Sequence, residues 1–285
     1  MMPSFGVIGS CQAYGVAESL KGWVPGATAY PLNAGSVATM SQDDQQKLAD
    51  KFADFDIVYV ESVDRISKGP LAAAALSEKV RVLRYPVVVY TGLHPDCVHI
   101  YNGSQLIQTH MGPYNSALAL AAFNAGLSPA RTEAIFNRFA FASLGYIEQR
   151  EAAKAELERY FQELGFSCSG FVDSAFMYTI NHPRIEVLHD ITKQALDISG
   201  FEREQDFVPS PTDTLLEGAI WPIYDGIGEG TGYIFRGHAN KGESRDIELA
   251  DFIAKSFEAY KEVGSVLSAP AVERALEFIE TEVIV

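Results

Sequence analysis

The sequence predicts an α+β fold in which a small parallel α/β subdomain at the N-terminus is embedded in a mainly helical protein. In residues 1–90, short β-rich runs alternate with helical patterns, and from residue 116 onward the pattern is helical without a comparable series of strands. Strands separated by crossover helices indicate a parallel sheet. We expect the α/β subdomain to cover residues 1–110 and the helical region 111–285, with one shared core because no linker separates them.

The predicted strands of the first region are short runs of apolar and β-branched residues. Between them, Ser41 is expected to cap a helix whose apolar residues Leu48, Phe52 and Phe55 recur at helical spacing. The strands are expected at residues 5–8, 27–30, 57–60, 80–83 and 87–90, and further helices at 12–21 and 70–79.

The second region contains six predicted helices and two long irregular segments. The irregular segments are residues 91–114 and 217–245. Loops longer than about 12 to 15 residues are uncommon in compact domains and often carry function. The helices are expected at 116–125, 130–144, 148–164, 184–198, 247–262 and 271–280.

The composition describes an acidic globular protein. Its 285 residues include 37 Asp and Glu against 22 Lys and Arg, a net charge of −15, which disfavours binding to nucleic acid or to an anionic membrane surface. The sequence contains no run of about 18 apolar residues, so it predicts no membrane span. Cys11, Cys97 and Cys168 match no disulfide framework, and the first residues lack a secretory signal, so we expect a cytoplasmic protein.

The first chemical signal is Gly-Ser-Cys-Gln at residues 9–12, between a predicted strand and a predicted helix. At the carboxyl end of a parallel strand such a turn opens into the ligand crevice, and the free N–H groups of the helix start lower the pKa of a thiol. Cys11 is therefore a candidate nucleophile or neighbour of an acyl thioester. The alternative is that Cys11 is a small buried apolar residue.

A second signal follows the run at 87–90. Pro95 disfavours helix at His94, which keeps its imidazole at a strand end where it can meet Cys11 as a base or cation. Asp96 can orient that ring or anchor the loop. A zinc site of His94, Cys97 and His99 with Cys11 is the less favoured alternative, because its spacing is not a common zinc pattern, and we expect no metal.

Three further segments supply candidate ligand-binding residues. Residues 111–116 contain a Gly-Pro pair that interrupts regular structure and then residues that can cap a helix. Residues 181–184 are expected to form a turn with several hydrogen-bond donors. The glycine-rich run 226–232 resembles a phosphate loop without satisfying its sequence pattern. This glycine-rich run is expected to be a flexible flap or hairpin. For each segment a plain turn or cap is the alternative. The candidate residues here are Tyr114, Asn115, Ser116, Asn181, His182, Arg184 and Arg236.

Taken together, the motifs resemble those of the WcbI-type capsular polysaccharide biosynthesis proteins. The motifs are residues 9–12, His-Pro-Asp at 94–96, Gly-Pro-Tyr-Asn-Ser at 112–116, Leu-Gly-Tyr at 144–146 and Asn-His-Pro at 181–183, in the same order across about residues 5–240. That family's usual first motif is Gly-Asn-Cys-Gln, so Ser10 is a departure that leaves the Cys and Gln in place.

The resemblance implies a cradle-like, mainly helical fold with coenzyme A in a loop-lined pocket. It also implies acetyl-CoA-dependent O-acetylation of a sugar or polysaccharide precursor in capsule or exopolysaccharide biosynthesis, in association with other enzymes of that process. Cys11 and His94 match the catalytic positions, and Ser10 and Gln12 join the candidates for binding coenzyme A. A Cys/His thioesterase or carbohydrate esterase, and a non-catalytic binder of coenzyme A or a nucleotide, remain the alternatives.

Overall fold

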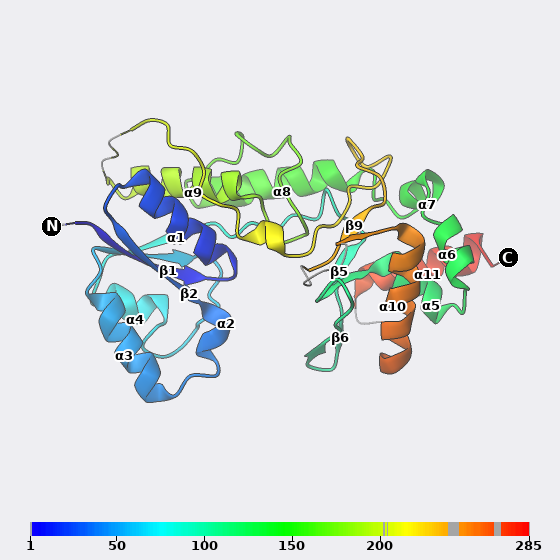
Figure 1. Ribbon diagram of the computed structural model, residues 1–285, viewed down its shortest axis with the longest axis horizontal. Helices are drawn as coiled ribbons and strands as arrows, with labels where there is room; N and C mark the ends of the chain where they lie inside the picture. Colours follow the sequence, from blue (N-terminus) through cyan, green and yellow to red (C-terminus); the bar gives the residue numbers. More distant parts are fainter. Residues whose placement is uncertain (1, 202, 204, 239–244, 265–268, 285) are drawn as a thin grey trace. The chain divides into compact units, whose positions relative to one another are not determined.

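The computed structural model describes residues 2–201, 203, 205–238, 245–264 and 269–284, and its chain forms two compact units (Figure 1). Each unit combines segments that are far apart in the sequence, so the division differs from a single cut at residue 110. The α+β class and the small parallel α/β region at the N-terminus are confirmed. Unit 1 comprises Met1–Val88, Leu157–Phe176 and His182–Leu215, and unit 2 comprises Val89–Glu156, Met177–Asn181 and Leu216–Val285.

Unit 1 is built on a four-stranded parallel sheet with the strand order β2-β1-β3-β4. Every residue of β3 is buried, as expected for an inner strand of a parallel sheet that is covered on both faces. In the register, Ile8 of β1 lies beside Val60 of β3, so the two strands end next to each other. The strands are β1 (Ser4–Gly9), β2 (Thr28–Asn33), β3 (Ile57–Glu61) and β4 (Val82–Tyr85).

Helices cover both faces of this sheet (Figure 1). On one face, Ile8, Val58 and Val60 pack in a cluster with Phe52 of α3 and Leu76 of α4. As predicted, the Ser41 side chain caps α3 by accepting a hydrogen bond from the backbone N–H of Asp44. The helices of unit 1 are α1 (Gln12–Trp23), α2 (Ala34–Val37), α3 (Gln42–Ala53), α4 (Ala73–Ser77) and α9 (Ile185–Ile198).

Residues 87–90 do not form the strand that was predicted for them. Their backbone groups bond elsewhere instead: the N–H of Val87 donates to the Tyr160 hydroxyl, and Val88 exchanges two hydrogen bonds with the Gln12 side chain. The N–H of Tyr90 donates to the carbonyl of Ile180. Val87, Val88 and Tyr90 are buried and Val89 is exposed, and side chains and a loop take the place of a neighbouring strand.

Unit 2 is mainly helical and contains three short two-stranded sheets among its described residues. The predicted helix at 130–144 is divided into two helices: the first ends at Ala134, and the Asn137 side chain caps the second by accepting a hydrogen bond from the N–H of Ala140. The rings of Phe235 and Phe252 stack at 3.8 Å in its core. The elements are β5 (Cys97–His99), β6 (Tyr101–Asn102), β7 (Gln105–Leu106), β8 (Tyr114–Ser116), α5 (Ala117–Asn124), α6 (Pro129–Ala134), α7 (Arg138–Ser143), β9 (Phe235–Arg236), β10 (Asp246–Ile247), α10 (Leu249–Val263) and α11 (Pro270–Glu282), while α8 (Gln149–Glu163) and the 3-10 helix Leu215–Glu217 continue from one unit into the other.

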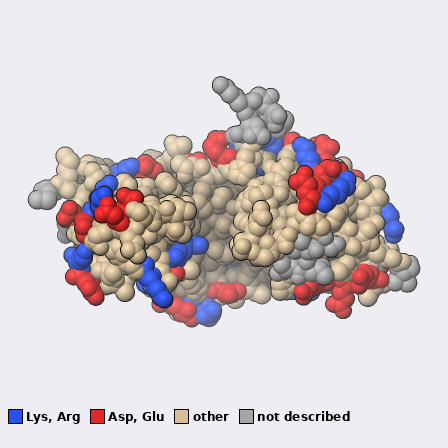
Figure 2. Space-filling model, turned by 90° about the horizontal axis from the view of Figure 1, so that it is seen from below, with Lys and Arg blue, Asp and Glu red and all other residues tan. Residues whose placement is uncertain are grey.

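Figure 2 shows the charged side chains on one face of the protein. On the face seen in Figure 2, Lys and Arg lie scattered among Asp and Glu rather than gathered in one basic patch. Within the part of the chain that the structure describes, no helix is long and apolar enough to cross a membrane.

Candidate functional site

The strand order of the sheet in unit 1 reverses between β1 and β3. From β1, the chain places β2 on one side and β3 on the other. In open parallel sheets, ligands bind outside the carboxyl ends of the strands at this switch point. Cys11 lies there, directly after β1 and as the N-cap residue of α1, and its side chain is partly exposed.

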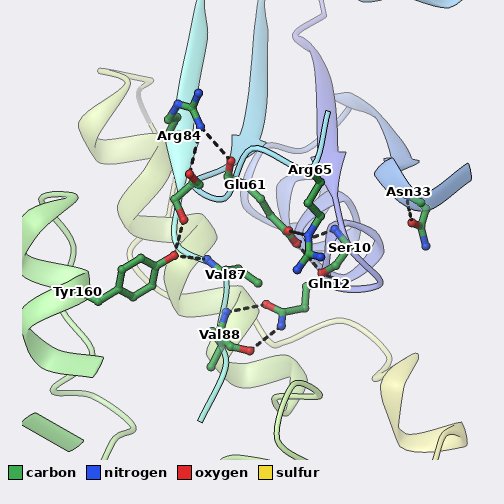
Figure 3. A network of polar contacts seen from close by, with 11 residues as sticks. Ser10, Gln12, Asn33, Glu61, Arg65, Arg84, Val87, Val88 and Tyr160 are labelled. Carbon is green, nitrogen blue, oxygen red and sulfur yellow. Dashed lines mark hydrogen bonds and ion pairs between the residues drawn. The ribbon is translucent and has the colours of Figure 1, made fainter. Parts of the chain in front are cut away.

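The turn of residues 9–12, here called the Cys11 turn, is held by hydrogen bonds to two neighbouring segments (Figure 3). The carboxylate of Glu61, at the end of β3, accepts hydrogen bonds from the backbone N–H of Ser10 at 2.6 Å and from its hydroxyl at 2.5 Å. The Gln12 amide donates to the carbonyl of Val88 at 2.8 Å and accepts from its N–H at 3.0 Å. Ser10 and Gln12, both candidate ligand residues, thus position the turn within unit 1.

The thiol of Cys11 is less acidic than its place at a helix start suggested. Burial raises the pKa of Cys11, and the nearby Glu61 carboxylate raises it further, while Ser10 and Arg65 lower it. The prediction of a lowered pKa is therefore wrong, because desolvation and a neighbouring negative charge outweigh the effect of the helix start.

His94 lies in unit 2 and is fully enclosed there. It is 1% exposed, and its ring nitrogens face the backbone carbonyls of Pro222 and Met177, each at 3.3 Å. Burial lowers the pKa of His94 to about 4, so the imidazole is neutral at pH 7. Because Cys11 and His94 belong to different units, their pairing stays a prediction.

Asp96 anchors its loop in unit 2. Its carboxylate is fully buried and accepts hydrogen bonds from the N–H of Leu118 at 2.8 Å and the hydroxyl of Tyr224 at 2.9 Å, with the Tyr146 hydroxyl at 3.3 Å. Burial raises the pKa of Asp96, and these donors lower it. Of the two roles expected for Asp96, anchoring the loop is the one that its contacts fit.

The candidates at residues 114–116 and 181 are brought together within unit 2. The Tyr114 hydroxyl donates to the Asn181 side-chain oxygen at 2.6 Å. The Asn115 amide donates to the carbonyls of Ile107 and Pro113, and the Ser116 hydroxyl caps α5. Tyr114, Asn115 and Ser116 are all buried, so their contacts serve the packing of this unit, and the capping expected of Ser116 is confirmed.

The remaining candidates lie apart from this cluster. His182 and the exposed Arg184 precede α9 in unit 1, where the Arg184 N–H donates to the carbonyl of Phe176. Arg236, on β9 of unit 2, forms an exposed ion pair with Asp246 at 2.8 Å. The roles of these residues in binding a ligand stay predictions. No group of three His, Cys, Asp or Glu side chains suited to a metal gathers among the described residues.

The glycine-rich run 226–232 forms a closed loop rather than a hairpin. The N–H of Thr231 donates to the carbonyl of Ile223 at 2.7 Å, and the Thr231 hydroxyl accepts from the N–H of Ile223 at 3.0 Å. The antiparallel pair that follows is β9 with β10, which lies beyond the run. Residues 239–244 of the expected long segment lie outside the described residues.

Sequence reasoning missed three side chains that surround the Cys11 turn. Glu61 is 1% exposed and forms an ion pair with Arg65 at 2.7 Å, and the buried hydroxyl of Tyr85 faces Gly9. The available signal was the acidic Glu61 directly after the apolar strand run at 57–60, because a charge there lies at the same sheet edge as Cys11.

The comparisons with known proteins agree on one family. The model of the WcbI family, described as a polysaccharide biosynthesis enzyme, matches residues 4–204. The chain is also similar to a solved structure of WcbI, "a novel polysaccharide biosynthesis enzyme", with 14% sequence identity and a TM-score of 0.73 over 98% of this chain and 94% of that one. That structure is described as the native protein without the disulfide bond between coenzyme A and one of its cysteines. No curated protein matches the chain.

Proposed function

Since the chain belongs to the WcbI family of polysaccharide biosynthesis enzymes, we propose that it transfers the acetyl group of acetyl-CoA to a hydroxyl of a sugar or polysaccharide precursor. The reaction would serve capsule or exopolysaccharide synthesis in the cytoplasm. The acyl donor is a substrate of the reaction and not a resident cofactor.

The observation that carries this proposal is the place of Cys11. It is a partly exposed thiol at the start of a helix and at the switch point of a parallel sheet. The similar WcbI structure is described in terms of a disulfide between coenzyme A and a cysteine, and such a bond requires the two sulfurs to meet. Cys11 is the cysteine of this chain best placed to meet the coenzyme, because Cys97 and Cys168 are buried.

Two routes for the acetyl group use this placement. In one, the Cys11 thiolate attacks the thioester carbon, the bond from that carbon to the coenzyme sulfur breaks, and the acetyl group passes from Cys11 to the sugar hydroxyl. In the other, Cys11 positions the thioester and the hydroxyl attacks it directly. In both, coenzyme A leaves as a thiol, and the backbone N–H of Cys11, which faces the sulfur, is suited to stabilise the oxyanion.

The hydroxyl must lose a proton during the attack, and His94 is the proposed general base. Its neutral form at pH 7 has a lone pair that can accept a proton. In this structure both ring nitrogens face carbonyls, so base catalysis requires one of them to exchange the carbonyl of Pro222 or Met177 for the sugar hydroxyl.

Binding of coenzyme A tests the proposal first. A ligand held only by the folded protein stabilises it by about 2.7 kcal/mol at 100 times its Kd. We expect millimolar coenzyme A to raise the melting temperature of the full chain, and pantetheine or AMP to act more weakly. No shift, together with no heat in calorimetry, would contradict both the transferase and the thioesterase reading.

Turnover then separates the alternatives. With acetyl-CoA, a transferase should hydrolyse the thioester slowly and release thiol faster when a suitable sugar is added. Rapid hydrolysis that no sugar changes would identify a thioesterase. Tight binding without any turnover would identify a non-catalytic binder.

A further inference from the structure

A buried carboxylate lies beside the candidate nucleophile. Glu61 is 1% exposed and ends β3, next to the end of β1, because Ile8 and Val60 are partners in the register. A buried charge is costly unless hydrogen bonds and an opposite charge accompany it. Oε1 of Glu61 accepts the N–H and the hydroxyl of Ser10, and Oε2 accepts the Nε–H of Arg65 at 2.7 Å (Figure 3).

The backbone before Cys11 is shaped to let this carboxylate approach. A Cβ atom on Gly9 would lie 2.7 Å from Oε1 of Glu61 and 2.4 Å from the hydroxyl oxygen of Tyr85. Contacts that close are not found for real Cβ atoms, so only glycine fits between the two side chains. The carboxylate therefore lies directly against the backbone of the Cys11 turn.

Three titratable side chains of unit 1 affect the Cys11 thiol. Glu61 acts as a negative charge and Arg65 as a positive charge, and they have opposite effects on the thiol. Tyr85 also interacts with Cys11, but burial raises the pKa of this phenol well above its ordinary value, so it is neutral at pH 7. The charge beside the sulfur at neutral pH is therefore that of the Glu61–Arg65 pair.

We propose that Glu61 and Arg65 are positioning residues for Cys11. Glu61 fixes the Cys11 turn through its hydrogen bonds to Ser10, and Arg65 offsets the negative charge of Glu61 beside the sulfur. The inference deepens the proposed function, since it concerns the nucleophile on which that function depends. Its consequence is that the balance of two charges, and not the fold of the turn alone, sets the reactivity of the thiol.

The test is the pH dependence of Cys11 alkylation by iodoacetamide in the full chain, measured by peptide mass spectrometry. Arg65→Met leaves the carboxylate uncompensated, so the midpoint should move to higher pH and labelling at pH 7 should slow by about threefold. Glu61→Gln removes the negative charge, so the midpoint should move to lower pH and labelling should accelerate by a similar factor. The double variant should return close to wild type.

Arg84→Met is the matched control for the loss of an arginine. Arg84 binds Asp64 and the backbone carbonyls of Glu61 and Ser62, but not the Glu61 carboxylate, so its loss should move the midpoint much less. The proposal is overturned if Arg65→Met and Glu61→Gln move the midpoint in the same direction, as a general loosening of the turn would do, or if Arg84→Met matches Arg65→Met. The Arg65 side chain is 41% exposed, so its variant tests the proposal even if Glu61→Gln fails to fold.

Labelling also separates this inference from the proposed function. If the two variants move the labelling midpoint in opposite directions but the protein transfers no acetyl group, the positioning role is supported and the transferase proposal is contradicted. If the protein transfers acetyl groups but the two variants do not move the midpoint in opposite directions, the transferase proposal is supported and the positioning role is contradicted.

Discussion

At the scale of single residues, Cys11 differs from the other two cysteines in its exposure to solvent. Cys97 and Cys168 are 1% and 2% exposed, and burial raises the pKa of Cys97 well above its ordinary value. Cys11 is partly exposed, although burial raises its pKa too. We therefore expect iodoacetamide at pH 7 to label Cys11 at least about tenfold faster than the buried thiols, since a thiol must be both accessible and ionised to react.

Mass spectrometry of the digested protein measures this selectivity, and coenzyme A should protect Cys11 alone. Equal labelling of the three thiols would show that Cys11 is as enclosed as the others. Labelling that coenzyme A leaves unchanged would place its binding site elsewhere.

The residues around Cys11 also show which parts of the site could be predicted from the sequence. The Gly-Ser-Cys-Gln motif identified the turn at the sheet edge, because a strand, a turn and a helix start are local features of the chain. Its partner Val88 could not be predicted, because the contact depends on the path of the segment after β4, whereas Glu61 was indicated by its place directly after the apolar run at 57–60. His94 and Asp96 were found as a motif, but their enclosure by residues 177 and 222–224 depends on contacts from distant parts of the sequence.

At the scale of elements, α3 begins after Ser41 as expected, whereas the predicted helix at 130–144 is two helices. The run at 87–90 was misassigned because an apolar segment that pairs with no strand can have the same composition as a buried strand. Its hydrogen bonds to the Gln12 side chain and the Tyr160 hydroxyl cannot be read from local sequence.

Two glycines of α1 give a matched prediction about helix packing. A Cβ on Gly15 would lie 2.5 Å from Cδ1 of Leu188 on α9, whereas a Cβ on Gly22 would meet only ordinary contacts at 3.7 and 3.9 Å. Gly15→Ala should therefore destabilise the protein by about 1–3 kcal/mol through overpacking. Gly22→Ala should stabilise it by up to about 1 kcal/mol, since alanine favours the helix.

Urea unfolding of the two variants beside wild type measures both effects. If Gly15→Ala were as stable as Gly22→Ala, the close crossing of α1 and α9 would be contradicted.

At the scale of the whole molecule, buried histidines make stability depend on pH. The pKa of His94 is lowered to about 4 in the folded protein and is about 6.5 when unfolded, so the unfolded chain takes up a proton first as the pH falls. The stability that this group contributes is complete above pH 6.5 and is lost between about pH 6.5 and 4. His110, with its pKa also lowered to about 4, acts in the same direction, and Asp96, with a raised pKa, acts in the opposite one.

Between pH 7 and pH 5, His94 alone should reduce the free energy of unfolding by about 2 kcal/mol. Urea unfolding at the two pH values should show this loss in wild type and a clearly smaller one in His94→Gln, whatever the absolute stability of the variant. An equal loss in both proteins would show that His94 titrates normally and is accessible in the folded state.

The central claim is that Cys11 lies where the acetyl group leaves coenzyme A. The most direct measurement is the mass spectrum of a nucleotide sugar or oligosaccharide after incubation with acetyl-CoA and either wild type or Cys11→Ala, with the melting temperature of both proteins as a control for folding. We predict an acetylated sugar and released thiol with wild type, and a loss of at least about a hundredfold in rate with the variant. Full acetyl transfer by a folded Cys11→Ala protein would contradict the account.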